Sequence, residues 1–148
     1  MSRAVVLDSS ALLCLLNGEV GAERVAEALP FAVIGAVNLA EVVTKLRERG
    51  LSVEEVEEVL GGLNLDVRPM TAVQAYAVGH LRQSTRSLGL SLGDRACLAL
   101  AVELSAPALT ADQAWGRVDA GMAVELIGLN EASAVLIDRH APLIGGAG

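Results

Sequence analysis

The chain has 148 residues, 53% of them hydrophobic, a formal net charge of −7 and a mean hydropathy of +0.50. This length fits one domain with a sizeable buried core, and the apolar content excludes a disordered chain. Aromatic residues make up only 2% of the chain, and its pI is near 4.7. These values argue against base-stacking platforms and against a basic nucleic-acid-binding surface, because both need side chains that the sequence largely lacks.

Short apolar and β-branched runs that end at polar or turn residues predict the strands. The predicted strands are Val5–Leu7, Phe31–Ile34, Leu65–Val67, Pro107–Leu109 and Val124–Ile127. Segments with apolar residues at a spacing of three to four predict the helices between them. The predicted helices are Ala11–Leu16, Glu19–Leu29, Ala36–Arg49, one from the cap Ser52 to Gly61, one from the cap Thr71 to about Ser87, and one from the cap Ser91 through Glu103.

Strands of about four residues that alternate with helices, without NG or DG hairpin signals, predict parallel pairing through helical crossovers. We expect an α/β fold with three layers, in which a central parallel sheet of about five short strands lies between helices. In this interpretation residues 1–148 form a single domain. Residues 129–148 are its C-terminal tail, which packs in part and has a frayed end.

The expected compartment is the cytoplasm. No apolar run reaches the ~18 uncharged residues of a bilayer span. The apolar stretch Ala4–Leu16 has some features of a secretion signal, but the polar residues Asp8–Ser10 interrupt it and no small-residue cleavage site follows. Cys14 and Cys97 lie among apolar residues and form no CxxC motif, which favours free core thiols in a reducing compartment.

Four acidic residues stand where such a fold can gather a ligand. Asp8 directly follows the first predicted strand and Asp112 lies shortly after the fourth, at the strand ends where open α/β sheets bind ligands. Glu41 and Asp94 lie early in apolar helices. The helix dipole alone could account for Asp94, and an ion pair with Lys45 one turn later could account for Glu41.

Four carboxylates in one pocket repel one another unless a cation is present. Oxygen ligands suit Mg²⁺ or Mn²⁺, and no nearby His or Cys offers the ligands that zinc prefers. Such an ion activates water and stabilises the charge of an in-line phosphodiester displacement. The metal, rather than a basic surface, would then receive the phosphate, which answers the objection raised by the negative net charge.

Four blocks of the chain, in this order, resemble the PIN domain family and within it the VapC-type toxin ribonucleases. They are VVLDSSALL at residues 5–13, NLAEV at 38–42, LSLGDRACLALA at 90–101 and LTADQAW at 109–115. The resemblance implies a Mg²⁺- or Mn²⁺-dependent endoribonuclease. Its catalytic and metal-binding acids would be Asp8, Glu41, Asp94 and Asp112. The hydroxyls that support these acids by hydrogen bonding would be those of Ser9, Ser10 and Thr110.

The resemblance also implies partners. The protein would be the toxin of a type II toxin–antitoxin pair, would cleave RNA and would be inhibited by a small cognate antitoxin. It would form a homodimer or a toxin–antitoxin hetero-oligomer. Some relatives carry a further acid on the third-block helix, where this chain has Leu98 and Ala101, so the number of ions stays open. Basic side chains that could meet RNA phosphates, with a solvated face as the alternative, are those of Arg95, Lys45, Arg82 and Arg86.

Other interpretations stay open beside this one. The fold could be a catalytically silent or regulatory α/β binding module that acts through protein partners. A receiver-like module needs a lysine near its last strand and a dehalogenase-like enzyme needs an acid at position 10, whereas this chain has its only lysine at Lys45 and a serine at Ser10. Asp119 fits a turn better than the acidic site, and His80 and His140 lie far from the acidic blocks in sequence.

Overall fold

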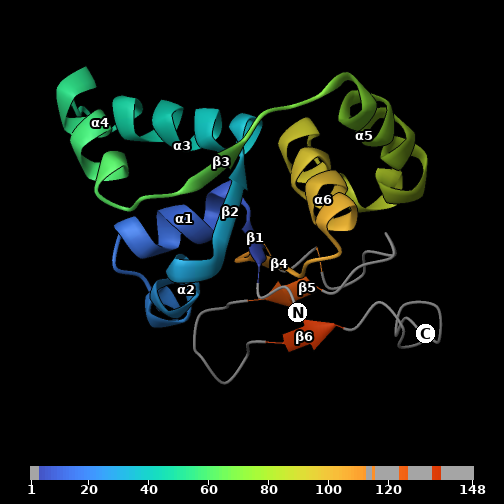
Figure 1. The fold of residues 1–148 in the computed structure, drawn as a ribbon, viewed down its shortest axis with the longest axis horizontal. Helices are drawn as coiled ribbons and strands as arrows, with labels where there is room; N and C mark the ends of the chain where they lie inside the picture. The colour runs from blue at the N-terminus through green and yellow to red at the C-terminus, as the bar shows by residue number, and fades with distance from the viewer. Residues whose placement is uncertain (1–3, 113–114, 116–123, 127–134, 138–148) are drawn as a thin grey trace.

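The computed structural model describes residues 4–112, 115, 124–126 and 135–137, which form one sheet with helices on both faces (Figure 1). The strands are β1 Val5–Leu7, β2 Ala32–Gly35, β3 Asp66–Arg68, β4 Ala108–Thr110, β5 Val124–Leu126 and β6 Val135–Ile137. They lie in the order β3-β2-β1-β4-β5-β6. The first five run parallel, and β6 is antiparallel to β5. The predicted α/β architecture is confirmed.

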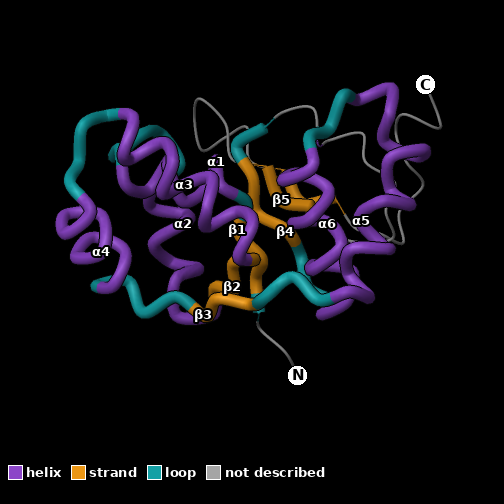
Figure 2. The backbone as a smooth tube through the Cα atoms, turned by 90° about the horizontal axis from the view of Figure 1, so that it is seen from above, coloured by secondary structure: helices purple, strands orange, loops and turns teal. Residues whose placement is uncertain are grey.

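The helices form the two outer layers. They are α1 Ser9–Leu16, α2 Ala22–Ala28, η1 Leu29–Phe31, α3 Ala36–Glu48, α4 Val53–Gly61, α5 Ala72–Thr85, η2 Arg86–Leu88 and α6 Leu92–Leu104. Figure 2 shows α1 to α4 on one side of the sheet and α5 with α6 on the other. Among the described residues, no helix combines the length and the apolar character needed to cross a bilayer.

The core follows from the alternation of side chains along each strand. Because successive strand residues point to opposite faces, Val6 packs against α6 whereas its neighbour Leu7 packs against α1 and α2. Helix α6 is buried at every position from Ala96 to Ala101, which explains why its sequence is apolar all round. This helix therefore has a fixed place against the sheet, and its first turn reaches the carboxyl end of β1.

Several boundaries differ from the prediction. Helix α1 begins at Ser9, two residues early, because the Asp8 side chain caps it. Phe31 belongs to η1, where the fixed φ of Pro30 favours a turn, so β2 starts one residue later. The strand β6 was not predicted. It lies within the predicted tail, and its antiparallel pairing corrects the expectation of a purely parallel sheet.

Candidate active site

The carboxyl ends of β1 and β4 are adjacent, since these strands pair in parallel although six α-helices and two strands separate them in sequence. The chain builds the sheet outward from β1 through β2 to β3 and then returns to the other side of β1 with β4. The order of strands thus reverses between β1 and β4. Ligands of open α/β sheets bind at such a reversal, beyond the carboxyl ends of the strands.

Asp8 lies at this point and is held by three donors. Its carboxylate accepts hydrogen bonds from the backbone N–H of Ala11 (2.8 Å), from Ser10 Oγ (2.7 Å) and from Thr110 Oγ1. The Ala11 contact is the N-cap of α1, which satisfies one of the free N–H groups of the helix. The other two contacts come from hydroxyls, one from each side of the junction between β1 and β4.

The same two hydroxyls also hold the chain that follows β4. Ser10 Oγ accepts from the backbone N–H of Ala111 (3.0 Å), and Thr110 Oγ1 accepts from that of Asp112 (2.9 Å). Each hydroxyl therefore uses its proton on the Asp8 carboxylate and a lone pair on the backbone. This network is the kind of support that the sequence predicts for Ser10 and Thr110.

Burial dominates the electrostatics of Asp8, whose side chain is 2% exposed. The pKa of Asp8 is raised to about 6, because loss of hydration, with a smaller contribution from the Asp94 carboxylate, outweighs the lowering effect of the three hydrogen bonds. Three donors thus fail to compensate for removing this carboxylate from water. A cation at this position would compensate for it.

Glu41 reaches the site from α3. Its Oε1 accepts from Ser9 Oγ (3.0 Å) and from Asn38 Nδ2 (3.1 Å), so Ser9 gives Glu41 the support that Ser10 gives Asp8. Lys45, the alternative partner predicted for Glu41, instead pairs with Glu48 at 3.6 Å on the outer face of α3. The Glu41 carboxylate is therefore turned toward the sheet and α6 rather than along the solvent face of its own helix.

Asp94 lies in the first turn of α6 as the partner of a capping box. Its Oδ2 accepts from the backbone N–H of Ser91 (2.9 Å), and its own N–H donates to Ser91 Oγ (3.1 Å). One turn further along α6 lies the buried thiol of Cys97, whose pKa is influenced by three of the candidate acids. Burial raises the pKa of Cys97 well above its usual value, and the carboxylates of Asp8, Asp94 and Glu41 raise it further. Acids from three segments thus act electrostatically on one thiol.

Asp112 follows β4 and its side chain is exposed. Its backbone is tied to Thr110, which places it beside the site, but the acids that act together on Cys97 are the other three. Of the described residues, no group of three or more Asp, Glu, His and Cys side chains is placed to bind one ion directly. The predicted assignments of the four acids stay predictions.

Comparison with known proteins identifies the fold family. A model of the PIN domain matches residues 5–121. The chain belongs to the PIN domain family. PIN domains are nucleases, so hydrolysis of nucleic acid is the activity that belongs to this family. A comparison with curated protein sequences gives no match.

Solved structures share the architecture of this PIN domain. It is similar to the DNA-bound VapBC of Salmonella typhimurium, with a TM-score of 0.65 and 19% identity over 82% of this chain and 96% of that chain. It is also similar to VapBC2 of Rickettsia felis bound to a promoter DNA fragment, with a TM-score of 0.64 and 17% identity over 86% of this chain and 98% of that chain. A third similar structure is VapBC-1 of nontypeable Haemophilus influenzae, with a TM-score of 0.63 and 18% identity over 88% of this chain and 100% of that chain. At these identities the likeness shows the fold.

The donor set of this PIN domain fits a hydrated divalent ion. Mg²⁺ keeps several of its waters and takes one or two carboxylates directly, so it needs no ready-made cage of protein ligands. Asp8 offers a buried carboxylate that has no cationic side chain as a partner among the described residues, and the Asp94 carboxylate raises its pKa. The ligands that zinc prefers are missing among the described residues near the acids, apart from the buried Cys97 thiol.

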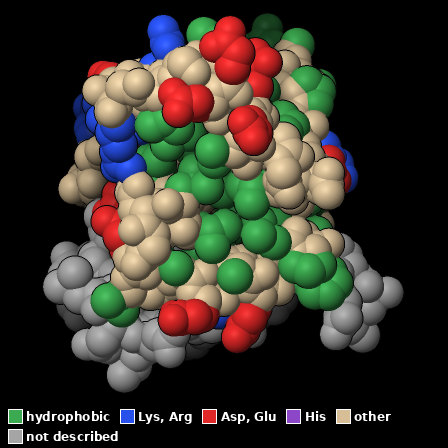
Figure 3. Space-filling view, turned by 90° about the vertical axis from the view of Figure 1, so that its left-hand side faces the viewer, with side chains coloured by type: hydrophobic (Ala, Val, Ile, Leu, Met, Phe, Trp, Pro, Cys, Tyr) green, Lys and Arg blue, Asp and Glu red, His purple; other side chains and the backbone are tan. Residues whose placement is uncertain are grey.

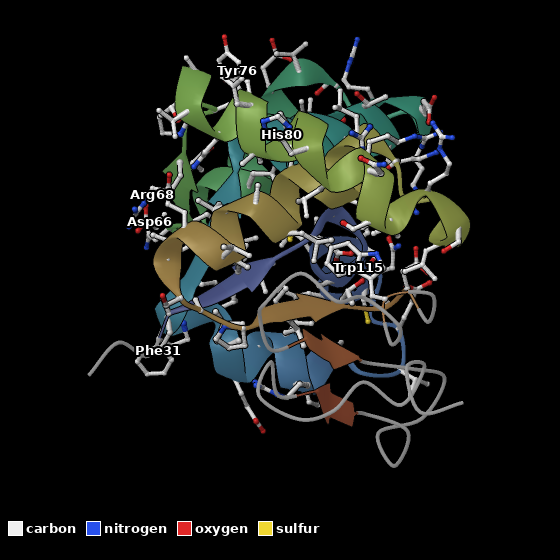
Figure 4. All side chains as sticks on the ribbon, turned by 90° about the vertical axis from the view of Figure 1, so that its right-hand side faces the viewer. Phe31, Asp66, Arg68, Tyr76, His80 and Trp115 are labelled. Carbon is white, nitrogen blue, oxygen red and sulfur yellow. The ribbon has the colours of Figure 1, made fainter. Side chains whose placement is uncertain are left out.

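Among the described residues, the four basic side chains predicted to meet RNA and the side chain of His80 make no hydrogen bond or ion pair with Asp8, Glu41 or Asp94. The Arg95 guanidinium turns toward α5 and donates to the carbonyl of Val78 (3.1 Å). Lys45, Arg82 and Arg86 are exposed. Figure 4 shows His80 with Tyr76 on the outer side of α5, their ring centroids 6.5 Å apart. Contact of these basic residues with RNA stays a prediction, and Asp119 and His140 lie outside the described residues.

Two residues of the site were missed by the sequence analysis. Asn38 stands one helical turn before Glu41 and is 1% exposed, and a polar residue within an apolar helical pattern was the available signal. Gly93 stands beside Asp94, and a side chain at Gly93 would collide with the Glu41 carboxylate. The one signal in the sequence for Gly93 was a glycine in the first turn of a helix that otherwise has strong helix-forming residues.

Proposed function

We propose that this PIN domain is a Mg²⁺- or Mn²⁺-dependent endoribonuclease and the toxin of a type II toxin–antitoxin pair, held inactive by its cognate antitoxin in the cytoplasm. The observation that carries the nuclease proposal is a set of hydrogen bonds at the reversal of strand order. Ser9, next to Asp8, donates to Glu41, and Asn38 joins Glu41 to Gly93, next to Asp94. The choice of RNA and the toxin role rest on the four-block sequence resemblance and on the similarity of fold to VapBC structures.

The proposed chemistry divides between ion and protein. Asp8, Glu41, Asp94 and Asp112 would hold the ion, directly or through its waters. The ion would supply an activated water and stabilise the charge of the phosphodiester displacement. Ser10 and Thr110 fix the Asp8 carboxylate from two sides, and Ser9 with Asn38 fixes that of Glu41. Such preorganisation means that the carboxylates need not rearrange during reaction.

The nuclease proposal is tested by two substitutions that remove charge and keep shape, Asp8→Asn and Asp94→Asn. We expect each to lower metal-dependent RNA cleavage by roughly 100-fold or more, because each removes a ligand of the ion. Cleavage of a labelled RNA by nuclease-free preparations, with Mn²⁺ and with EDTA, measures this. The matched control is Asp66→Asn, an exposed carboxylate paired with Arg68 on β3. Equal cleavage by the parent protein and both site variants would refute the assigned roles.

A partner surface accompanies the site. Helices α3 and α4 enclose a groove of about 390 Å³, lined by Leu39, Val43, Arg47, Val53, Val56, Glu57 and Leu60. Figure 3, which shows the side of the molecule that carries these helices, has hydrophobic side chains gathered in a hollow. Exposed apolar grooves of this kind mark protein-binding surfaces. We assign this groove to the antitoxin.

The antitoxin assignment predicts that binding and cleavage can be separated. Val53 is 50% exposed at the groove, and Val53→Arg should weaken co-purification with the antitoxin while leaving metal-dependent cleavage unchanged. Val102→Arg, at a similarly exposed valine of α6, is the control and should bind as the parent does. Pull-down of a tagged antitoxin encoded beside this chain measures binding. Undiminished binding by Val53→Arg would remove the groove from the interface.

A further inference from the structure

Asn38 is the most buried polar side chain next to the acids that is not itself an acid or a hydroxyl. It lies in the first turn of α3 with 1% of its surface exposed. Its Nδ2 donates to Glu41 Oε1 (3.1 Å) and to the carbonyl oxygen of Gly93 (3.0 Å). Because both partners can only accept, the orientation of the carboxamide is fixed by its surroundings. Asn38 thus joins the Glu41 carboxylate to the first turn of α6.

The Glu41 carboxylate is confined from the other side by Gly93. A Cβ at this glycine would come within 2.5 Å of the Glu41 carboxyl carbon, so a larger residue would displace this carboxylate from its place between Ser9 and Asn38. Ser9 and Asn38 both donate to Oε1, and the described residues donate no hydrogen bond to Oε2. The three neighbours therefore hold one oxygen of Glu41 and leave the other for a different partner.

The carboxamide of Asn38 does more than fill space. Its Oδ1 is buried and finds no hydrogen-bond partner among the described residues. A buried acceptor without a partner opposes folding, so an apolar side chain of similar size would serve packing better. The amide nitrogen, which makes both contacts, is the part of Asn38 that an apolar residue could not replace.

We propose that Asn38 is a positioning residue, which fixes the Glu41 carboxylate against α6 so that Oε2 stays available to the divalent ion or to one of its waters. This inference rests on the proposed function, since it needs an ion at the site. Residues that orient metal ligands by hydrogen bonding change metal affinity by about 10–100-fold when they are removed. Loss of the Asn38 amide should therefore weaken ion binding through Glu41.

The test is a double-mutant cycle on Mn²⁺ affinity, measured by electron paramagnetic resonance of free Mn²⁺ without any substrate. Asn38→Leu should weaken Mn²⁺ binding by about 10–100-fold, and Glu41→Gln should weaken it at least as much. The double variant should bind no more weakly than Glu41→Gln alone, because Asn38 acts only through Glu41. Asn38→Leu removes the unpartnered Oδ1 and also both hydrogen bonds of Nδ2, so its thermal midpoint in EDTA measures the effect on the fold separately from Mn²⁺ affinity. Asn38→Ala, which adds no volume, completes the same cycle if the leucine variant does not fold.

The matched control is Gln74→Leu. Gln74 is a second buried amide, 7% exposed, on α5. Its Nε2 donates to Glu103 Oε2 of α6 (2.8 Å), apart from the candidate acids, so its loss should leave Mn²⁺ affinity unchanged. Additive losses from Asn38 and Glu41 substitutions, or unchanged Mn²⁺ affinity in Asn38→Leu, would overturn the positioning role while the proposed function stands. A parent protein that binds no Mn²⁺ would overturn the proposed function itself.

Discussion

In the proposed function Asp8 meets two opposing demands, because it must be ionised to bind a cation and it is almost fully buried. Three hydrogen bonds favour the ionised form, yet the balance still raises its pKa to about 6. A buried carboxylate with this pKa destabilises the protein whenever it is charged and has no cation beside it. In the proposed function the site therefore gives up stability of the metal-free protein for metal binding, as functional sites commonly do.

This trade predicts how stability depends on pH in EDTA. Because the folded pKa of about 6 lies above the ordinary 3.8, the contribution of Asp8 to stability is full below pH 3.8 and is lost as pH rises through 6. At pH about 8 the loss approaches about 3 kcal/mol. Asp8→Asn cannot ionise, so it should be more stable than the parent by up to that amount near pH 8, and by little near pH 4, in urea unfolding.

The comparison of Asp8→Asn with the parent cancels all other titrations of the chain. Asp66→Asn is the control of opposite sign, because the hydrogen bond from Arg68 lowers the pKa of Asp66, so its replacement should not stabilise at any pH. A stability difference between Asp8→Asn and the parent that is the same at pH about 4 and about 8 would show that burial of the charge is not its source.

At the scale of elements, the two serine capping boxes share one motif in different surroundings. Ser52 with Glu55 starts α4, and Ser91 with Asp94 starts α6. Both caps satisfy free N–H groups of a helix, and their serines contribute about 1 kcal/mol each. Only the second box includes a candidate ligand, so the start of α6 carries both a structural and a chemical role.

This pairing predicts a selective effect. Ser91→Ala and Ser52→Ala should each lower the free energy of unfolding by about 1 kcal/mol. Ser91→Ala alone should lower RNA cleavage, by about 10-fold, because fraying of the first turn of α6 releases Asp94. Urea unfolding and a cleavage assay on both variants measure the two effects. Equal cleavage by the two variants, at equal stability loss, would show that the position of Asp94 does not depend on its cap.

Local chemistry explains which elements the sequence could predict. The caps Ser52, Thr71 and Ser91 were predicted correctly because cap preferences depend on a few neighbouring residues. The start of α1 was wrong because Asp8 was assigned to the site alone, although the same carboxylate also caps the helix. The strand β6 was missed because its pairing with β5 is decided by tertiary contacts that a three-residue run does not encode.

For the whole molecule, the predictable part of the site is the part set by strand order. Asp8 and Thr110 are 102 residues apart, yet their contact follows from the rule that β1 and β4 flank the reversal of a parallel sheet. The contact of Asn38 with Gly93 depends instead on how closely α3 approaches α6. Helix spacing follows from packing of many side chains at once, and no local pattern in the sequence reports it.

Because the acids come from four segments, the ion should stabilise the fold as a whole. Binding to the folded state alone adds about 2.7 kcal/mol at 100 times the dissociation constant, which for a chain of this length raises the unfolding midpoint by roughly 5–10 °C. We expect this rise on addition of Mn²⁺ and its reversal by EDTA, in thermal scans followed by circular dichroism. Asp8→Asn and Asp94→Asn should lose most of the rise, whereas Asp66→Asn should keep it. Since Asp8→Asn starts from a more stable metal-free state, its midpoint in EDTA should exceed the parent's while its response to Mn²⁺ is smaller. The same rise in all variants would mean that the ion binds elsewhere on this acidic chain.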